Sequence, residues 1–329
     1  MFKAAALLIL MSLPLPMRTE LDAPHTILVH AHRGGRAYRP ENSIPSFRYA
    51  ISVGADVLEL DLAVTKDNVL VVSHSPFLTQ PAPETFSNSK DPKMAAVITA
   101  ALANERHCDG PPLPPGTYIH SLTLAQLKQY DCGSHALPAF PNQVAEPHTT
   151  IPTFEEVLDL APQGEFQFNV ETKIFPNRAE ITPTPEAFVS MIDEAVKRHH
   201  LQSRVILQSF DFRTLQAMRV LDPSIRLSAL FGQAQYDRMM GITDADKTFA
   251  HVAQAAQLRP GDFFSPDASL ATPAEVKWAH EHGFQVAPYT VNAADGWQKL
   301  ADAHVDAIIT DDPAGLLKWL RAQDPALHP

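Results

Sequence analysis

The sequence predicts an α/β protein folded as one (β/α)8 TIM barrel, and three observations support this prediction. Short β-branched runs alternate with amphipathic helical stretches along most of the chain, which is typical of a parallel sheet with crossover helices. Eight such strands can be counted, the number that closes a barrel. The composition, with 45% hydrophobic and 19% charged residues, is that of a globular protein.

The elements follow one another in a regular order. Strands are expected at residues 26–31, 56–62, 166–172, 204–209, 226–230, 262–265, 285–290 and 307–310. Helices are expected at residues 43–53, 153–160, 185–200, 212–221, 247–258, 273–282, 294–304 and 313–322. Thr153 and Glu156 have the spacing of a capping box, which predicts where the second of these helices begins.

Residues 69–73 are also expected to be extended, but they follow the second strand after the short turn 65–68. Parallel neighbours need a crossover of a dozen residues or more. We therefore predict that 69–73 is an antiparallel partner of the second strand and rises over the barrel mouth. It would carry His74 to that mouth from outside the barrel proper.

Residues 76–152 interrupt the repeat and are rich in Pro, Asn and Ser. A structureless loop of this length would be unusual in a compact domain, so we interpret it as an inserted Pro-rich subdomain at the C-terminal rim. Its two cysteines, Cys108 and Cys132, can form one disulfide, with two free thiols as the alternative. A short helix is expected at 123–130.

The N-terminus has the features of an export signal. Lys3 supplies a positive charge, and residues 4–13 form an apolar run too short to span a bilayer. We interpret residues 1–22, approximately, as a signal peptide, residues 23–329 as the barrel, and the location as periplasmic or secreted. A frayed apolar terminus is the alternative. No later segment is long and apolar enough for stable membrane insertion.

The formal charge of −11 at pH 7 argues against a nucleic-acid-binding module, because such a surface repels polyanions and anionic membranes. An acidic protein would also need a local cation to hold a phosphate ester. A small molecule is therefore the expected partner, and the sequence leaves the oligomeric state open.

Three carboxylates give the sharpest indication of chemistry. Glu59 and Asp61 alternate with leucines in the second strand, so both side chains point to one face. Two acids inside a barrel are costly unless a cation compensates them, whereas solvated acids on an outer face are the alternative. Glu171 repeats the pattern in the next barrel strand. Three carboxylates suit one divalent cation, Ca²⁺ or Mg²⁺.

Histidines and cations flank this expected site. His32 ends the first strand and His74 ends the hairpin, so the two could form a proton-transfer pair. Arg33 and Lys173 are candidate phosphate contacts. His30 could form a His-x-His zinc pair with His32, but the nearby acids are hard oxygen ligands and argue against zinc.

Polar residues at the later strand ends are less specific. Tyr289 and Asn292 end the seventh strand and could line the substrate pocket, although a structural role is an equal alternative. Asp311 follows the eighth strand and is interpreted as a helix cap.

Taken together, these motifs resemble the glycerophosphodiester phosphodiesterase family. The resemblance covers nearly all of the chain after the expected signal. The matching stretches are His32-Arg33-Gly34-Gly35, Pro40-Glu41-Asn42-Ser43, Gly54-Ala55-Asp56, Glu59-Leu60-Asp61, Thr65-Lys66-Asp67, His74, Val170-Glu171-Thr172-Lys173, Gln208-Ser209-Phe210, Thr290-Val291-Asn292 and Thr310-Asp311-Asp312-Pro313.

The resemblance implies metal-dependent hydrolysis of glycerophosphodiesters to sn-glycerol 3-phosphate and an alcohol, with the insertion as a variable module on the substrate side. The residue roles that it implies are metal ligation by Glu59, Asp61 and Glu171, acid–base chemistry by His32 and His74, phosphate contact by Arg33 and Lys173, and support beside the metal by Glu41. Tyr289 departs from the family, where Trp is common, which leaves the head group open.

Two other functions are weighed against this one. A phospholipase D-like enzyme acting on lysophospholipid or sphingomyelin would use the same chemistry, but the insertion shows no aromatic cluster to meet a lipid. A non-catalytic phosphodiester-binding barrel is the less favoured alternative, because both histidines and all three carboxylates are intact.

Overall fold

The computed structural model describes residues 26–80, 104–175, 178, 180–232, 248–323 and 327–328. The expected signal peptide, residues 1–22, lies outside this range, as do residues 81–103 of the insertion and residue 247 of one expected helix. The signal peptide and the periplasmic or secreted location therefore stay predictions.

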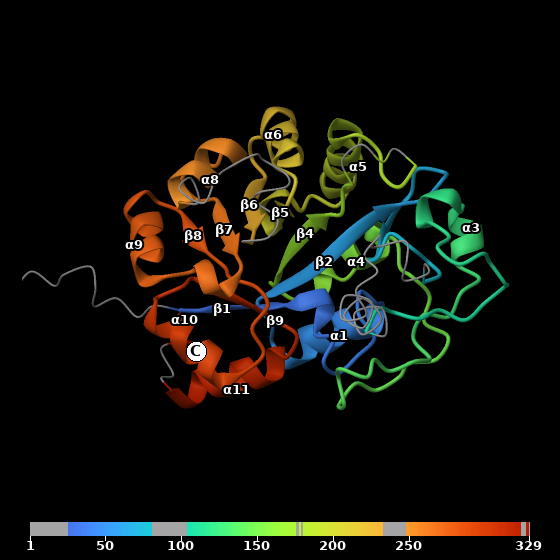
Figure 1. Cartoon of the computed structure of the whole chain (residues 1–329), viewed down its shortest axis with the longest axis horizontal. Coiled ribbons are helices and arrows are strands. Elements are labelled where there is room, and N and C mark those ends of the chain that lie inside the picture. Colours follow the sequence, from blue (N-terminus) through green and yellow to red (C-terminus); the bar gives the residue numbers. More distant parts are fainter. Residues whose placement is uncertain are drawn as a thin grey trace, which may run out of the picture.

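Eight parallel strands form the predicted barrel, with helices packed around them (Figure 1). The strands are β1 Leu28–Ala31, β2 Val57–Val64, β4 Gln167–Thr172, β5 Val205–Ser209, β6 Arg226–Phe231, β7 Phe263–Pro266, β8 Gln285–Val286 and β9 Ala307–Thr310. They pair in the order β8-β7-β6-β5-β4-β2-β1-β9. Backbone hydrogen bonds of 3.0 Å, from Asp306 to Val286 and from Ile309 to Pro288, join β8 to β9 and nearly close the barrel. The TIM-barrel prediction is confirmed.

The helices alternate with the strands as expected. They are α1 Ile44–Val53, α4 Phe154–Leu158, α5 Pro185–Arg198, α6 Phe212–Leu221, α8 Phe249–Ala256, α9 Pro273–Glu281, α10 Ala294–Asp302 and α11 Pro313–Gln323. The capping box at the start of α4 is confirmed, because the Thr153 hydroxyl accepts from the Glu156 N–H and the Glu156 carboxylate accepts from the Thr153 N–H. Over the described ranges, no helix combines the length and apolar character required to cross a bilayer.

The strand expected at 285–290 is shorter than predicted, since β8 covers only Gln285–Val286. Pro288 has no N–H to donate and interrupts the ladder on this side. Tyr289 joins the neighbouring strand end only through an isolated bridge with Asp267. Beyond Pro288, the Tyr289 backbone still hydrogen-bonds to Pro266 and Ala268, and the Val291 N–H donates to Ile309, so this segment stays attached to both neighbouring strands.

Strand β2 shows how one strand serves both the core and the site. All eight of its residues are buried. Leu58, Leu60 and Leu62 belong to the main hydrophobic cluster together with side chains of the surrounding helices. Glu59 and Asp61 alternate with these leucines and face the opposite way, into the barrel.

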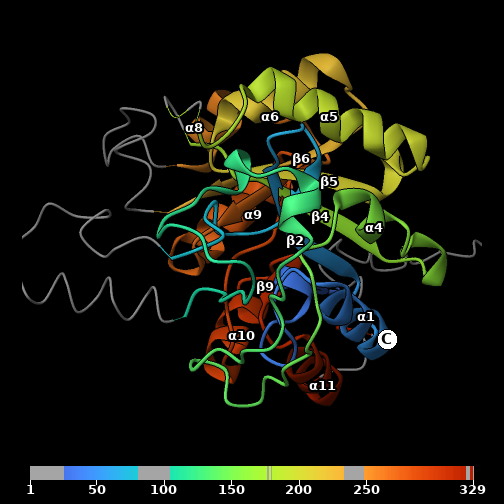
Figure 2. The same cartoon turned by 90° about the vertical axis from the view of Figure 1, so that its right-hand side faces the viewer.

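The hairpin partner of β2 is confirmed as strand β3, Leu70–Val72, which pairs antiparallel with Leu62, Ala63 and Val64. The insertion packs on this hairpin and covers that side of the barrel (Figure 2). It holds the short helix α3, Leu124–Leu127. A second hydrophobic cluster, separate from the main one, joins hairpin and insertion through Ala63, Val71, Leu78, Ile119, Leu122, Leu127, Tyr130, Cys132 and Ile151.

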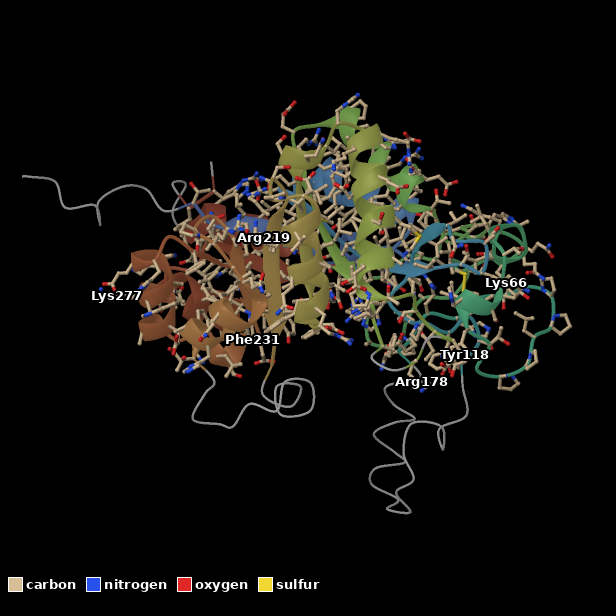
Figure 3. All side chains as sticks on the ribbon, turned by 90° about the horizontal axis from the view of Figure 1, so that it is seen from above. Lys66, Tyr118, Arg178, Arg219, Phe231 and Lys277 are labelled. Atoms are coloured by element: carbon tan, nitrogen blue, oxygen red, sulfur yellow. A yellow bond between two sulfur atoms is a disulfide. The ribbon has the colours of Figure 1, made fainter. Side chains whose placement is uncertain are left out.

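Two further links fasten the insertion. Cys108 and Cys132 form a disulfide, seen as the yellow bond in Figure 3. Arg178, after β4, donates to the Tyr118 hydroxyl at 2.7 Å, and Figure 3 shows these two side chains next to each other. The disulfide therefore joins two parts of the insertion, and the hydrogen bond from Arg178 to Tyr118 joins the insertion to the loop after β4.

Candidate active site

The three predicted carboxylates meet at the C-terminal ends of β2 and β4. Strand register places Asp61 beside Glu171 and Glu59 beside Asn169. One oxygen of each of Glu59, Asp61 and Glu171 lies within 4.8 Å of the others, and all three side chains are buried. The pairing of β2 with β4 brings Glu171 beside Glu59 and Asp61, although it lies far from them in the sequence.

Neutral donors fix the orientation of two of these carboxylates. Glu59 accepts from the Arg33 backbone N–H at 2.8 Å and from the Gln208 side-chain amide at 2.7 Å. Asp61 accepts from the Asn42 side-chain amide at 2.8 Å. Each carboxylate thus keeps oxygen lone pairs directed into the barrel mouth while its position is held by hydrogen bonds.

The charges of this site are poorly balanced by the protein alone. Burial, reinforced by Asp61 and Glu171, raises the pKa of Glu59 well above its ordinary value. Burial and Asp61 also raise the pKa of Glu171 to about 7. Burial would raise the pKa of Asp61 too, but the Lys173 ammonium, 3.0 Å away, and neighbouring cationic groups hold it well below its usual range.

A divalent cation fits this donor set. The ligands available are carboxylate oxygens, the donors that Ca²⁺ and Mg²⁺ prefer. Lys173 bridges Asp61 and Glu171, at 2.7 Å from the latter, and Arg33 also approaches Asp61, but Arg33 is shared with Glu41, so these cations do not balance the buried carboxylates. Burial, with repulsion between the carboxylates adding to it, raises the pKa values of Glu59 and Glu171, and a bound cation would stabilise their charged forms.

Glu171→Gln is expected to stabilise the protein at pH 8 in the presence of chelator and to change its stability little at pH 5. The pKa of Glu171 rises from 4.5 to about 7 on folding. Between these values the folded state holds more protons than the unfolded state, so the wild type loses stability as the pH rises. The glutamine variant avoids this loss of stability, which the shift of the Glu171 pKa places at about 3 kcal/mol above pH 7. Denaturant unfolding at both pH values measures it.

The exposed Glu165→Gln is the control for that experiment. A stabilisation by Glu171→Gln that is equal at pH 5 and pH 8 would contradict the expected linkage.

A strained turn after β1 places the next group of residues. His32–Gly34 form a short 3-10 turn in which Arg33 has a left-handed φ of 50°. Gly34 has φ +81°, and a Cβ there would lie 2.4 Å from the Ser46 hydroxyl oxygen, so glycine is required. The turn points the Arg33 N–H at Glu59. Such strain in a non-glycine residue is typical of functional sites.

The side chain of Arg33 enters a buried ionic cluster. It donates to Glu41 at 2.9 Å, and its Nε lies 3.4 Å from Asp61 Oδ2. Glu41 also accepts from Arg36 at 3.2 Å. Glu41 therefore orients the guanidinium groups of Arg33 and Arg36 beside the site. The turn that carries Glu41 also positions Asn42, whose side-chain amide donates to Asp61.

His32 is held by a residue that the sequence did not reveal as its partner. Its Nδ1 lies 2.5 Å from Asp311 Oδ1, at the end of β9, while its Nε2 lies 4.0 Å from Glu59. Burial lowers the pKa of His32, and Asp311 opposes that shift. Asn292 donates to the other Asp311 oxygen at 2.7 Å. The imidazole is thus anchored through Nδ1, which leaves Nε2 for chemistry.

His74 lies at the end of the hairpin and meets the insertion. Its Nδ1 is 3.7 Å from Glu105 Oε2, and neither atom has a hydrogen-bond partner among the residues described. Arg106 donates to the Ser73 hydroxyl at 2.6 Å. Burial, with Arg33 and Lys173, lowers the pKa of His74 well below its ordinary value. The insertion therefore contributes Glu105 and Arg106 directly beside this histidine.

Several expectations need correction or refinement. Asp311 is not the helix cap, because the Asp312 carboxylate accepts from the Gly315 N–H at 2.7 Å in that role. His30 is buried, and no candidate metal-binding group among the described residues contains it together with His32. Asn292 positions Asp311, while Tyr289 is half-buried against the edge of Phe210.

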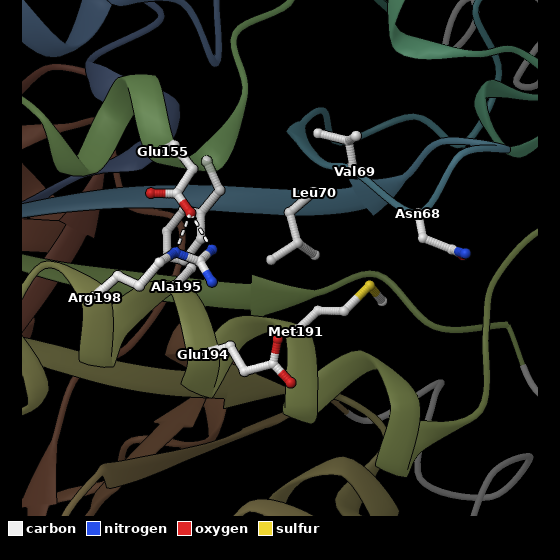
Figure 4. Close-up of a pocket in the computed structure, with 9 residues that line it drawn as sticks. Asn68, Val69, Leu70, Glu155, Met191, Glu194, Ala195 and Arg198 are labelled. Atoms are coloured by element: carbon white, nitrogen blue, oxygen red, sulfur yellow. Dashed lines mark hydrogen bonds and ion pairs between the residues drawn. The ribbon is translucent and has the colours of Figure 1, made fainter.

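A cavity of about 230 Å³ elsewhere is not the site. It lies outside the barrel between the hairpin, α4 and α5, and Figure 4 shows the ion pair of Glu155 and Arg198 on one side of it. Its other walls include Leu70, Met191 and Glu194. It contains none of the histidines or carboxylates described above, so the barrel mouth remains the candidate active site.

Comparisons with known proteins agree with this location. The family model of the "Glycerophosphoryl diester phosphodiesterase family" matches residues 32–315, a span that starts at His32 and includes every residue of the site. The chain belongs to this family. The predicted resemblance, and with it the prediction of a phosphodiesterase, are confirmed.

Individual members of the phosphodiesterase family match along most of their length. A glycerophosphodiester phosphodiesterase of Caldanaerobacter subterraneus is 27% identical, over 89% of this chain and 98% of its own. A structure from Silicibacter pomeroyi, described with the family's name, has a TM-score of 0.74 at 24% identity, over 91% and 95% of the two chains. An Oleispira antarctica phosphodiesterase, solved with the product sn-glycerol-3-phosphate, has a TM-score of 0.64 at 20% identity, over 89% and 96%.

Proposed function

We propose that this family member hydrolyses glycerophosphodiesters to sn-glycerol 3-phosphate and an alcohol, with the help of one divalent cation. The observation that carries the proposal is the buried set of Glu59, Asp61 and Glu171 at the barrel mouth, flanked by His32 and His74. The names of the relatives support the substrate class, as does the product bound to the Oleispira antarctica enzyme.

Glu59, Asp61 and Glu171 would hold Ca²⁺ or Mg²⁺. Such an ion supplies charge stabilisation for the phosphoryl oxygens as negative charge develops on them. Arg33 and Lys173 border the same carboxylates and would add donors on the phosphate side. The remaining steps depend on proton transfer by the protein's own groups.

His32 is the better placed general base. Asp311 holds its Nδ1 and favours the imidazolium that forms when Nε2 accepts a proton from the attacking hydroxyl group. One route uses the glycerol 2-hydroxyl as this nucleophile and gives a cyclic phosphate, which water then opens. His74 would give its proton to the oxygen of the departing alcohol, because a bound anionic phosphate favours the protonated form of a neighbouring histidine.

Glycerophosphocholine is the substrate that tests the proposal first. With purified protein we expect release of sn-glycerol 3-phosphate and choline, measured enzymatically, and loss of this release on chelation. Lysophosphatidylcholine and sphingomyelin, assayed in parallel, should be turned over more slowly, because the described side chains around the three carboxylates are charged or polar and suit a small polar diester better than an acyl chain. Faster turnover of the acylated diesters would favour the phospholipase D-like function, and absence of turnover on all three would contradict the proposal.

A further inference from the structure

Three exposed side chains form a second cluster of metal-binding groups, on the insertion and outside the active site. His107, Asp109 and His135 each offer a ligand atom, and these atoms all lie within 4.8 Å of one another. The Asp109 carboxylate is 3.4 Å from His107 Nε2 through one oxygen and 2.7 Å from His135 Nε2 through the other. The two imidazole rings meet edge to face at 4.8 Å between centroids. The two histidines thus flank one carboxylate.

The backbone builds this cluster from two segments. His107 and Asp109 lie two residues apart in an extended segment and share a face, with Cys108 directed to the other. Cys108 forms the disulfide to Cys132, and Asp109 and Asp131 exchange two backbone hydrogen bonds of 2.7 and 2.8 Å. A covalent bond and a bridge therefore fix the segment that carries His107 and Asp109 against the segment that leads to His135.

A tight turn then presents His135 to its partners. The Asp131 carboxylate accepts from the Gly133 N–H at 2.9 Å, from the Ser134 hydroxyl at 2.7 Å and from the His148 N–H at 2.6 Å. These bonds leave Asp131 fully engaged in shaping the turn. The backbone segments that carry the three ligand side chains are consequently held in place by the fold itself, which lowers the entropy lost when the side chains bind an ion.

We propose that His107, Asp109 and His135 bind a divalent transition-metal ion of the zinc type. Two imidazole nitrogens and one carboxylate oxygen are a donor set that Zn²⁺ accepts, with its fourth position open to water. The donor set differs from the all-carboxylate set of the active site, so the two sites would select different ions. A protein of formal charge −11 also attracts cations to its surface.

The distances fit such an ion with small movements. Ligands about 2.0–2.1 Å from a tetrahedral Zn²⁺ lie roughly 3.4 Å from one another. His107 Nε2 lies 3.4 Å from one Asp109 oxygen and His135 Nε2 lies 2.7 Å from the other, and one ligand atom from each residue lies within 4.8 Å of the others, so side-chain rotations of an ångström or so, in order of magnitude, would bring one set of three to this spacing. All three side chains are exposed and can rotate by this amount. The bound ion would link the two segments a second time, beside the disulfide.

Counting bound ions with the full oxidised chain tests the proposal. Zn²⁺ and, in a second series, Co²⁺ are titrated into wild type, into His107→Ala/His135→Ala, and into a control, His251→Ala/His282→Ala. The control removes two exposed histidines at α8 and after α9, on the other side of the barrel from α3 (Figure 1). Calorimetry gives the number and affinity of sites, and Co²⁺ absorption reports imidazole ligands.

We expect wild type and control to bind one more ion per chain than the cluster variant, since any binding at the active site is common to all three. Asp109→Asn should keep the hydrogen bonds of the cluster and weaken zinc binding about tenfold or more. Circular dichroism and intact-mass analysis of the disulfide establish that the variants are folded. The proposal is overturned if the folded cluster variant binds as many Zn²⁺ ions as wild type, with the same affinity.

Discussion

Replacement of His32 by alanine is expected to lower kcat for glycerophosphocholine about a thousandfold, the usual size of a general acid–base contribution. His32 Nε2 faces the carboxylate site, and Asp311 holds Nδ1 at 2.5 Å. No other described histidine shares that position, because His30 lies buried below the site and His74 approaches from the hairpin. The measurement is steady-state kcat and KM at saturating divalent cation.

Asp311→Asn separates chemistry from folding in the same experiment. It keeps the shape of the anchor but removes the charge that favours the imidazolium, so kcat should fall less than in His32→Ala and the acidic limb of the pH profile should move to lower pH. His251→Ala, an exposed change, should have no effect on kcat. A His32→Ala enzyme that is folded and retains a tenth or more of its kcat would rule out His32 as the base.

The second large effect is expected from the metal set. Chelation should abolish turnover of the wild type, and added Ca²⁺ or Mg²⁺ should restore it. Asp61→Asn removes one of the two carboxylates that Lys173 bridges in the site. It should raise the cation concentration needed for half activity by about a hundredfold, because a charged ligand is replaced by a neutral one.

Asp159→Asn is the matched control, since its side chain is 71% exposed and lies outside the barrel mouth. Direct Ca²⁺ and Mg²⁺ binding by calorimetry distinguishes weaker binding from slower chemistry. Two results would show that these carboxylates do not bind a catalytic cation. One is half activity of Asp61→Asn at the same cation concentration as the wild type, and the other is full activity of the wild type after exhaustive chelation.

Much of this site was predictable because local periodicity carries its main features. The alternation of Glu59 and Asp61 with leucines fixes their face in any strand. Glu171 has the same phase in the next barrel strand, and the pairing of β2 with β4 makes the two patterns meet. The short turn before residue 69 likewise demanded an antiparallel hairpin, because no crossover fits there.

The partners of these groups could not be predicted in the same way. His32 and Asp311 are 279 residues apart and meet only because β1 pairs with β9. Two adjacent acids follow β9, and Pro313 at the first helical position favours Asp312 as the cap, but no local pattern tells that Asp311 meets His32. Glu105 gives no periodic signal at all, since it comes from an irregular insertion. Gln208 and Asn42 lay within the matched motifs, but their contacts with Glu59 and Asp61 required the closed barrel.

The division of the molecule into two hydrophobic clusters has an evolutionary consequence. The three buried carboxylates stand on barrel strands and His32 directly follows β1, where a change in length would shift the register of neighbouring strands. His74 and Glu105 instead belong to a hairpin and insertion with an apolar cluster of their own. We therefore expect related enzymes to differ in the length and sequence of the hairpin and insertion, and with them in the alcohol that they release. The residues of the site that the barrel strands position should differ much less.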